Sequence, residues 1–134
     1  VDSHFYIGNS SRTNSDGARQ LVEILKKYGM TGSTIRVDDG LHLKSGVAYL
    51  EDNHIVATSA FANKTEFQKY KVIKVEDKES YSANCVWING KVLVPVGFPK
   101  AKDSIRSYGY ETIELDMSEF RKLDGGLSCL SLRF

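Results

Sequence analysis

This sequence of 134 residues contains no long apolar run, no excess of charge of either sign and few cysteines and histidines. No apolar stretch approaches the roughly 18 residues that a membrane-spanning helix requires. The formal net charge is +1 and the basic residues are scattered, so electrostatics favours neither nucleic acid nor a membrane surface as a partner. Two cysteines and three histidines lack the spacing of a metal site. We therefore expect no metal, no cofactor, no nucleic acid and no membrane partner.

The two cysteines, Cys85 and Cys129, could in principle form one disulfide. The first residues do not resemble a signal peptide, and cysteines of proteins that are not secreted are usually free thiols. These observations favour free thiols and a cytoplasmic location. Cys85 lies inside an apolar segment, and we interpret it as a small buried hydrophobic residue.

Strand-like and helix-like patterns alternate along the chain and recur. The apolar content of 41% is enough for a hydrophobic core, and this length makes one domain or a part of a larger one. Two predicted helices end alike, in Lys27-Tyr28-Gly29 and Ser107-Tyr108-Gly109. The strands that follow the predicted helices begin near residues 33, 71 and 110, which gives a repeat of about 40 residues. The sequence thus predicts repeated ββαβ units of an α/β fold.

Helix caps and breakers predict where individual elements begin and end. Ser15 is the predicted N-cap of the first helix, and Gly29 ends that helix. Asn63-Lys-Thr-Glu66 resembles a capping box and opens a short helix that reaches Tyr70. The predicted strands cover residues 5–9, 33–37, 41–50, 54–59, 71–75, 85–88, 92–97, 110–115 and 127–134.

The third unit has the clearest turn signals. Asn89-Gly90 lies between two apolar runs and predicts a tight hairpin. Pro99 opens the following helix and Gly109 ends it. The chain is therefore expected to hold three units, the first one strand short, followed by a single last strand. A ring of such units must close to satisfy its edge strands, so we expect a complement to this chain.

The segment Leu123-Asp-Gly-Gly-Leu-Ser-Cys129 offers the best nucleophile in the sequence. A glycine pair just before a cysteine lets the backbone turn sharply and leaves the sulfur room to face a ligand. A thiol attacks efficiently only when it is ionised, which requires a polar or cationic environment and usually a partner base. We interpret Cys129 as a nucleophile.

Among the three histidines, His42 is the best candidate for the partner base. It follows a glycine turn at the start of a predicted strand, and Cys129 lies in another first strand about two repeats further on. His4 lies at the chain start and His54 at a predicted hairpin tip, so we expect both to be solvated. From the residues alone, a satisfied core histidine is an equal alternative for His42.

Five motifs follow one another along the whole chain. They are Tyr6-Ile-Gly-Asn-Ser-Ser-Arg-Thr-Asn14, Gly40-Leu-His-Leu-Lys-Ser45, Ala83-Asn-Cys85, Leu115-Asp-Met-Ser-Glu-Phe120 and Leu123-Asp-Gly-Gly-Leu-Ser-Cys129. In this order and spacing they resemble the dimethylarginine dimethylaminohydrolases, guanidino-modifying enzymes of the pentein superfamily. The resemblance implies a five-bladed α/β propeller, of which this chain holds roughly three blades. It matches only the C-terminal half of these enzymes, so residues 1–134 are expected to be a portion of one catalytic domain without an internal boundary.

The resemblance also implies an activity and a role for each site residue. Dimethylarginine is hydrolysed to citrulline and dimethylamine through a covalent intermediate between Cys129 and the amidino carbon. His42 is the general acid and then the general base. Arg12 binds the α-carboxylate of the substrate, a task suited to a planar guanidinium. The other residues that the resemblance assigns to substrate binding are Ser45, Leu123 and Asp124.

Three alternatives stay open at this point. Arginine deiminases and amidinotransferases of the same superfamily share the cysteine and the histidine, although Leu41-His-Leu-Lys-Ser45 favours the dimethylarginine branch. The acidic residues that grip the guanidinium are expected in the N-terminal half of the family's enzymes. This chain could therefore be a non-catalytic fragment that needs that half, or a companion chain, as its partner. Unpaired strand edges also make a homo-oligomer possible.

Overall fold

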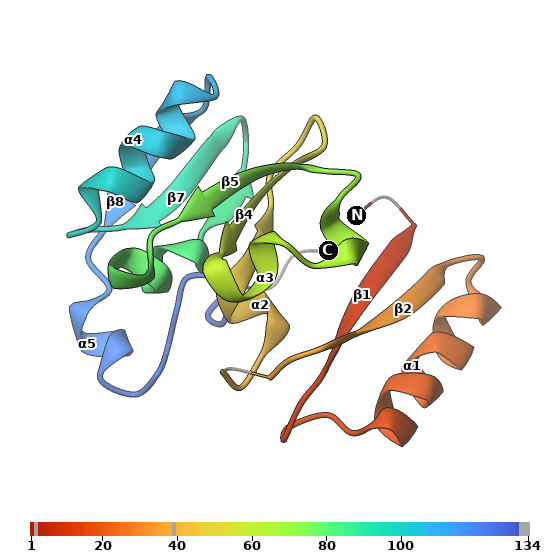
Figure 1. Cartoon of the computed structure of the whole chain (residues 1–134). Helices are drawn as coiled ribbons and strands as arrows, with labels where there is room; N and C mark the ends of the chain where they lie inside the picture. The colour runs from red at the N-terminus through yellow and green to blue at the C-terminus, as the bar shows by residue number, and fades with distance from the viewer. Residues whose placement is uncertain (2, 39, 132–134) are drawn as a thin grey trace. The chain divides into compact units, whose positions relative to one another are not determined.

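The computed structural model describes residue 1, residues 3–38 and residues 40–131 (Figure 1). Its contacts divide into two compact units, Val1–Leu43 and Lys44–Phe134. In the described part of the chain, no helix is both long enough and apolar enough to cross a membrane. The expectation of one catalytic domain over residues 1–134 stays a prediction.

The first unit is a parallel pair of strands joined by a helix. β1 (His4–Asn9) pairs with β2 (Thr31–Arg36), and α1 (Ser15–Lys27) connects them. Its small core consists of Ile7, Ala18 and Leu25, with Val22 and Met30 packed against it. This two-stranded sheet confirms that the first unit is one strand short within the described residues.

Asn14, and not Ser15, caps the first helix. The Asn14 Oδ1 accepts a hydrogen bond from the Gly17 N–H at 2.8 Å, which satisfies one of the free donors of the first turn. Gly29 ends the helix as predicted, with φ 71°.

The second unit repeats one pattern twice: an antiparallel strand pair followed by a third strand that runs parallel to the second. The first sheet consists of β3 (Val47–Tyr49), β4 (His54–Thr58) and β5 (Lys71–Val75). The second sheet consists of β6 (Val86–Ile88), β7 (Lys91–Pro95) and β8 (Glu111–Leu115). This repetition confirms the ββαβ prediction, and Figure 1 shows the labelled strands of each sheet side by side.

Short helices connect the strands. They are α2 (Leu43–Gly46), α3 (Ser59–Ala62), the 3₁₀ turn η1 (Thr65–Phe67), the 3₁₀ segment η2 (Asp77–Ala83), α4 (Pro99–Ser107) and α5 (Ser118–Arg121). The helix predicted to open at Pro99 and the hairpin at Asn89-Gly90 are confirmed; both hairpin residues have positive φ, 50° and 77°. The helix predicted up to Tyr70 is only the 3₁₀ turn η1.

Two predicted strands are wrong. The strand predicted over 41–50 begins only at Val47, because residues 43–46 form α2. The strand predicted over 127–134 is absent over its described part, where residues 127–130 form turns; residues 132–134 lie outside the described residues. The Gly126 carbonyl accepts hydrogen bonds from the N–H groups of Cys129 (3.0 Å) and Leu130 (3.2 Å), so the backbone closes on itself and does not pair with a strand.

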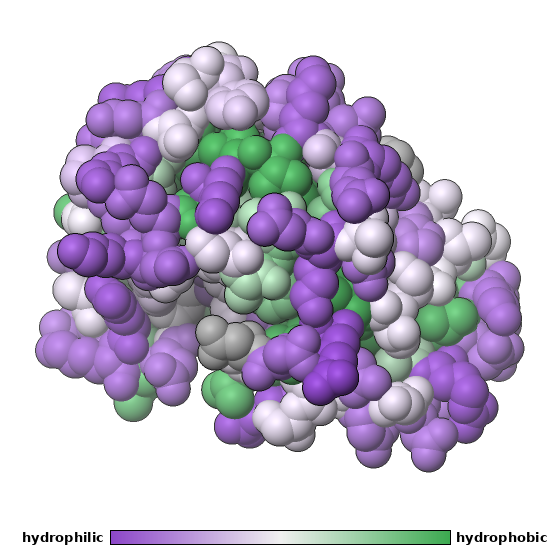
Figure 2. Space-filling view, in the orientation of Figure 1, coloured by the Kyte–Doolittle hydropathy of each residue, from purple (hydrophilic) through white to green (hydrophobic). Residues whose placement is uncertain are grey.

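The main core of the second unit lies between the two sheets, η2 and α4. It includes Val56, Ile73, Val92, Val94 and Ile105, each at most 2% exposed. Figure 2 shows hydrophilic residues over most of the visible surface, with apolar residues only in patches between them. Because η2 packs against this core, the end of η2 and the start of β6 have a fixed place next to the cysteine turn.

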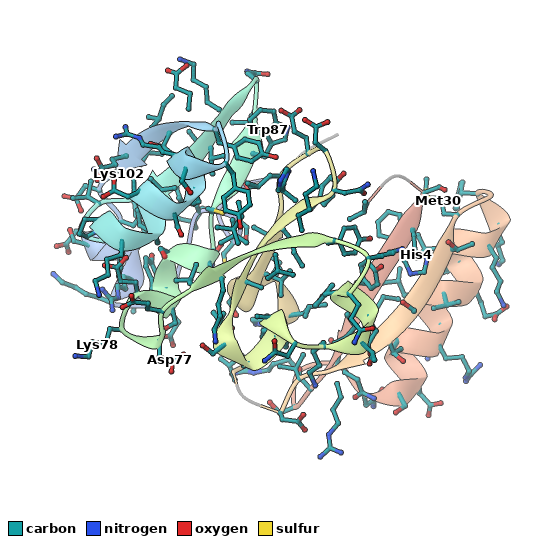
Figure 3. All side chains as sticks on the ribbon, turned by 45° about the horizontal axis from the view of Figure 1, so that its top comes forward. His4, Met30, Asp77, Lys78, Trp87 and Lys102 are labelled. Atoms are coloured by element: carbon teal, nitrogen blue, oxygen red, sulfur yellow. The ribbon has the colours of Figure 1, made fainter. Side chains whose placement is uncertain are left out.

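Both histidines expected to be solvated make hydrogen bonds, and the expectation is wrong for His54, which is buried. His54 is only 9% exposed, and its Nδ1 lies 2.9 Å from the Tyr110 hydroxyl. His4 lies on β1 (Figure 3), with its ring nitrogens 2.8 Å from the hydroxyls of Thr31 and Ser33 on β2. In both cases the partner comes from a neighbouring element that the local sequence does not reveal.

We expect Ile105→Ala to destabilise the second unit. Ile105 is fully buried on α4, so the truncation leaves a cavity and lowers the free energy of unfolding by about 2–5 kcal/mol. Denaturant-induced unfolding followed by circular dichroism measures it. The matched control is Ile113→Ala on β8, a side chain 39% exposed, for which we expect a clearly smaller loss; equal losses would contradict this account of the core.

Candidate active site

Cys129 lies in the turn that follows α5, and its side chain is exposed. The turn is anchored by Leu127, which is 8% exposed and packs with Val86 of β6 and Met117. The sulfur therefore sits at the surface, two residues beyond a buried apolar anchor. The backbone around this thiol belongs to neither a strand nor a helix.

Asn84 supplies the missing support through its side-chain amide. Its Oδ1 accepts a hydrogen bond from the Ser128 N–H at 2.9 Å, and its Nδ2 donates to the Cys129 sulfur at 3.4 Å. Asn84 directly follows η2, and only 4% of it is exposed. One buried amide thus holds both the backbone of the turn and the candidate nucleophile.

The glycine pair serves close packing, and the backbone reversal is made by another residue. Neither glycine of the pair has positive φ; Asp124 does, with φ 58°. A Cβ on Gly126 would lie 2.0 Å from the Asn84 Nδ2, far inside van der Waals contact. Gly126 is therefore required for Asn84 to reach the cysteine turn, which corrects the expectation that the glycines provide the sharp turn.

Tyr81 and Arg121 hold the start of the turn. The Tyr81 hydroxyl donates to the Gly125 carbonyl at 2.7 Å, and the Arg121 guanidinium carbon lies 4.7 Å from the centre of the Tyr81 ring. A cation over an aromatic face is an attractive contact, so Arg121 holds α5 against η2 and the Tyr81 hydrogen bond holds the turn against η2.

Lys44 fixes the carbonyl next to the nucleophile and adds positive charge. Its Nζ donates to the Ser128 carbonyl at 2.8 Å. Partial burial raises the pKa of the Cys129 thiol, but the hydrogen bond from Asn84, a backbone hydrogen bond from Gly126 and the Lys44 charge together lower that pKa by more. The pKa of Cys129 therefore lies below its ordinary value, and a larger share of the thiol is ionised near neutral pH.

Cys85 has the opposite environment. It is 2% exposed in the core of the second unit, and burial raises the pKa of its thiol to about 12. The interpretation of Cys85 as a buried hydrophobic residue is confirmed. Both cysteines are free thiols.

A cavity of about 320 Å³ lies beside the cysteine turn within the second unit. Apolar side chains of β3 and β6 line it, together with the polar groups of Lys44, Tyr49, Ser128 and Ser131. The mixture of apolar walls and a few polar groups is typical of a small-molecule site.

The remaining predicted site residues are divided between the two units. Ser45 lies half-buried in α2, Leu123 is 88% exposed, and Asp124 is exposed in the turn after α5. His42 and Arg12 belong to the first unit, where both are exposed. His42 directly precedes α2, so the prediction that it opens a strand is wrong, as it is for Cys129. The binding and acid–base roles of these residues stay predictions.

Asn84, Tyr81 and Lys44 belong to the site but were not predicted from the sequence. Asn84 and Lys44 stood inside quoted motifs, but no pattern joined either to Cys129, which lies 45 residues beyond Asn84. The usable signal was a polar residue directly before an apolar strand, in Ala83-Asn-Cys85. Among the described residues, no group of three or more His, Cys, Asp or Glu side chains could hold a metal ion.

The sequence resembles curated proteins over almost its whole length. No family model matches the chain. The chain is 52% identical, over all of its 134 residues, to N(G),N(G)-dimethylarginine dimethylaminohydrolase of Pseudomonas aeruginosa, of which it covers 53%. It is 29% identical to a protein of the same name from Streptomyces coelicolor, covering 99% of this chain and 51% of that protein. The chain thus spans about half the length of the curated relatives it matches.

Solved structures show the same resemblance in the fold. The Pseudomonas aeruginosa enzyme, as a cysteine-to-serine mutant with citrulline, matches with a TM-score of 0.96 and 51% identity, covering 100% of this chain and 52% of that one. A histidine-to-glycine dimethylarginine dimethylaminohydrolase, as an adduct with S-methyl-L-thiocitrulline, matches with a TM-score of 0.96 and 51% identity, covering 100% and 53%.

A more distant structure shares the fold alone. The N-terminal domain of ArgZ, an arginine dihydrolase from cyanobacteria, matches with a TM-score of 0.82 at 22% identity, covering 96% of this chain and 50% of that one. The resemblance and the fold class predicted from the motifs are thus confirmed. In sequence and in fold, the chain resembles about half of a dimethylarginine dimethylaminohydrolase with the repeated ββαβ units of the pentein superfamily.

The contrast between the two thiols predicts selective alkylation. Iodoacetamide should modify Cys129 in the folded protein and leave Cys85 unmodified, because only Cys129 is exposed and has a lowered pKa. A lowered pKa places the midpoint of the rate against pH below that of the same cysteine in the urea-unfolded chain. Mass spectrometry of timed samples measures both quantities; equal labelling of the two cysteines would contradict the assignment.

Proposed function

We propose that this chain, which matches half of a dimethylarginine dimethylaminohydrolase, carries the nucleophile of an enzyme that hydrolyses methylated arginine to citrulline. The observation that carries the proposal is the exposed Cys129 thiol, held by Asn84 and stabilised as a thiolate beside Lys44, in a chain 52% identical to such an enzyme over its whole length.

In the proposed reaction the Cys129 thiolate attacks the guanidinium carbon of dimethylarginine and forms a carbon–sulfur bond. His42 protonates the departing nitrogen, the carbon–nitrogen bond breaks and dimethylamine leaves. His42 then takes a proton from water, which attacks the same carbon. The carbon–sulfur bond breaks, citrulline leaves and the thiolate is regenerated. The bonds formed and broken in this reaction balance without a redox step or a cofactor.

The spacing of the two residues supports their roles. The variants of the two solved relatives replace a cysteine and a histidine whose numbers differ by 87, which is also the separation of His42 and Cys129 in this chain. One of those proteins was crystallised with citrulline and the other as an adduct with S-methyl-L-thiocitrulline, both of which contain the citrulline framework.

We assign the remaining roles from the same resemblance. Arg12 binds the substrate α-carboxylate, since its guanidinium is exposed and makes no ion pair within the described part of the chain. Ser45, Leu123 and Asp124 line the substrate site, where the 88% exposed side chain of Leu123 is available to cover an apolar part of a ligand. The two free thiols fit a cytoplasmic location.

The half-length match makes a complement part of the proposal. The acidic residues that would grip the guanidinium are assigned to the N-terminal half of the family, supplied by the same polypeptide or by a companion chain. Arginine deiminase or amidinotransferase chemistry is the second candidate. The arginine dihydrolase structure that suggests it shares only the fold, so the dimethylarginine branch is favoured.

The first functional prediction concerns the complement. The 134-residue chain alone should release citrulline from dimethylarginine at the background rate, because carboxylates for the guanidinium are not among the motifs it carries. Co-expression with the half of the Pseudomonas aeruginosa relative that this chain does not match should restore release. Colorimetric citrulline assays measure it, with arginine as the alternative substrate. Full activity of the chain alone would contradict the need for a complement.

The second functional prediction separates the two cysteines. In the complemented protein, Cys129→Ala should reduce citrulline release to background, whereas Cys85→Ala should retain most of it, because Cys85 is buried and its thiol stays neutral. Steady-state rates at saturating dimethylarginine measure both. Equal loss from the two variants at equal thermal stability would show that Cys129 is not the nucleophile.

A further inference from the structure

We propose that Asn84 is a further catalytic residue of this site: its side-chain amide holds the Cys129 sulfur in position and stabilises the thiolate by a hydrogen bond. The inference rests on the proposed function only in taking Cys129 as the nucleophile. It concerns the chemistry of the thiol itself, which can be measured without turnover.

The orientation of the Asn84 amide follows from its backbone partner. The Ser128 N–H can only donate, so the atom that faces it at 2.9 Å must be the carbonyl oxygen of the side chain. The NH₂ group then faces the Cys129 sulfur at 3.4 Å. A donor that points at the sulfur favours the thiolate over the thiol, because a charged acceptor forms the stronger hydrogen bond.

Burial makes this contact rigid. Asn84 is 4% exposed, and a buried amide without hydrogen bonds costs free energy, so rotation away from both partners is unfavourable. The Asn84 backbone N–H donates to the Tyr81 carbonyl at 3.2 Å, which fixes its main chain at the end of η2. That end is held by the core, whereas the start of η2, where Figure 3 labels Asp77 and Lys78, is exposed.

Gly126 provides the space for the amide. A Cβ there would lie 2.0 Å from the Asn84 Nδ2 and 2.6 Å from its Cγ, so any other residue displaces the amide from the sulfur. The glycine at position 126 therefore allows the Asn84 side chain to approach the cysteine turn. Two positions 42 residues apart, Asn84 and Gly126, are both required for the contact.

The decisive variant is Asn84→Asp. A carboxylate oxygen can still accept the Ser128 N–H, so the hold on the turn is retained, but the donor to sulfur is replaced by a negative charge that disfavours the thiolate. In a Cys85→Ala background, the alkylation rate of Cys129 by iodoacetamide at pH 7 should fall about tenfold or more, with the midpoint of the pH profile shifted up by about one unit. The control is Asn63→Asp, the same charge change at an exposed residue, which should leave the profile unchanged.

Gly126→Ala tests the same contact without altering Asn84. The added methyl group displaces the amide, so the pH profile of alkylation should shift in the same direction. Circular dichroism identifies the temperature range in which each variant is folded, and rates are compared there. An unchanged or lowered midpoint in folded Asn84→Asp overturns the inference. A second outcome separates the inference from the proposed function. If Asn84→Asp raises the midpoint but the unmutated chain with its complement releases no citrulline, the inference is supported and the proposed function is rejected.

Discussion

The turn that carries Cys129 depends on one buried hydrogen-bonding group, the side-chain amide of Asn84. The turn lies outside the sheets, so none of its groups is held by a strand ladder. Asn84 binds the N–H of Ser128 and the sulfur of Cys129, while Lys44 binds the Ser128 carbonyl. A nucleophile must keep a fixed place relative to its target, and here side chains from two separate segments supply that constraint.

The repeated sheets provide the rigidity on which this constraint relies. η2 connects β5 of the first sheet to β6 of the second, and the core between the sheets includes Val75 at one end of the connection and Cys85 at the other. Asn84 stands directly before Cys85, so the same packing that buries Cys85 places the Asn84 amide next to the cysteine turn. The repeat therefore also positions the site, because the connection between its two sheets carries Asn84.

The two cysteines show how position in this frame determines chemistry. Cys85 is buried in the core, where desolvation raises its pKa to about 12 and keeps it neutral. Cys129 is exposed, and the hydrogen bond from Asn84 and the Lys44 charge offset its partial burial, so its pKa is lowered. Identical side chains thus become a core residue and a candidate nucleophile through their surroundings alone.

The sequence by itself determined the repeat, the Asn89-Gly90 hairpin and the helix from Pro99, because each depends on local turn chemistry or on periodicity. It also offered Cys129 as the candidate nucleophile, although the glycine pair on which that choice rested does not make the turn. Only the tertiary structure decided which residues support that nucleophile and what Gly126 is for. The Asn84–Cys129 contact joins positions 45 residues apart and leaves no periodic trace. The burial of His54 under Tyr110 is of the same kind. Local patterns report the conformation of a segment, whereas the environment of a side chain is set by segments that packing brings to it.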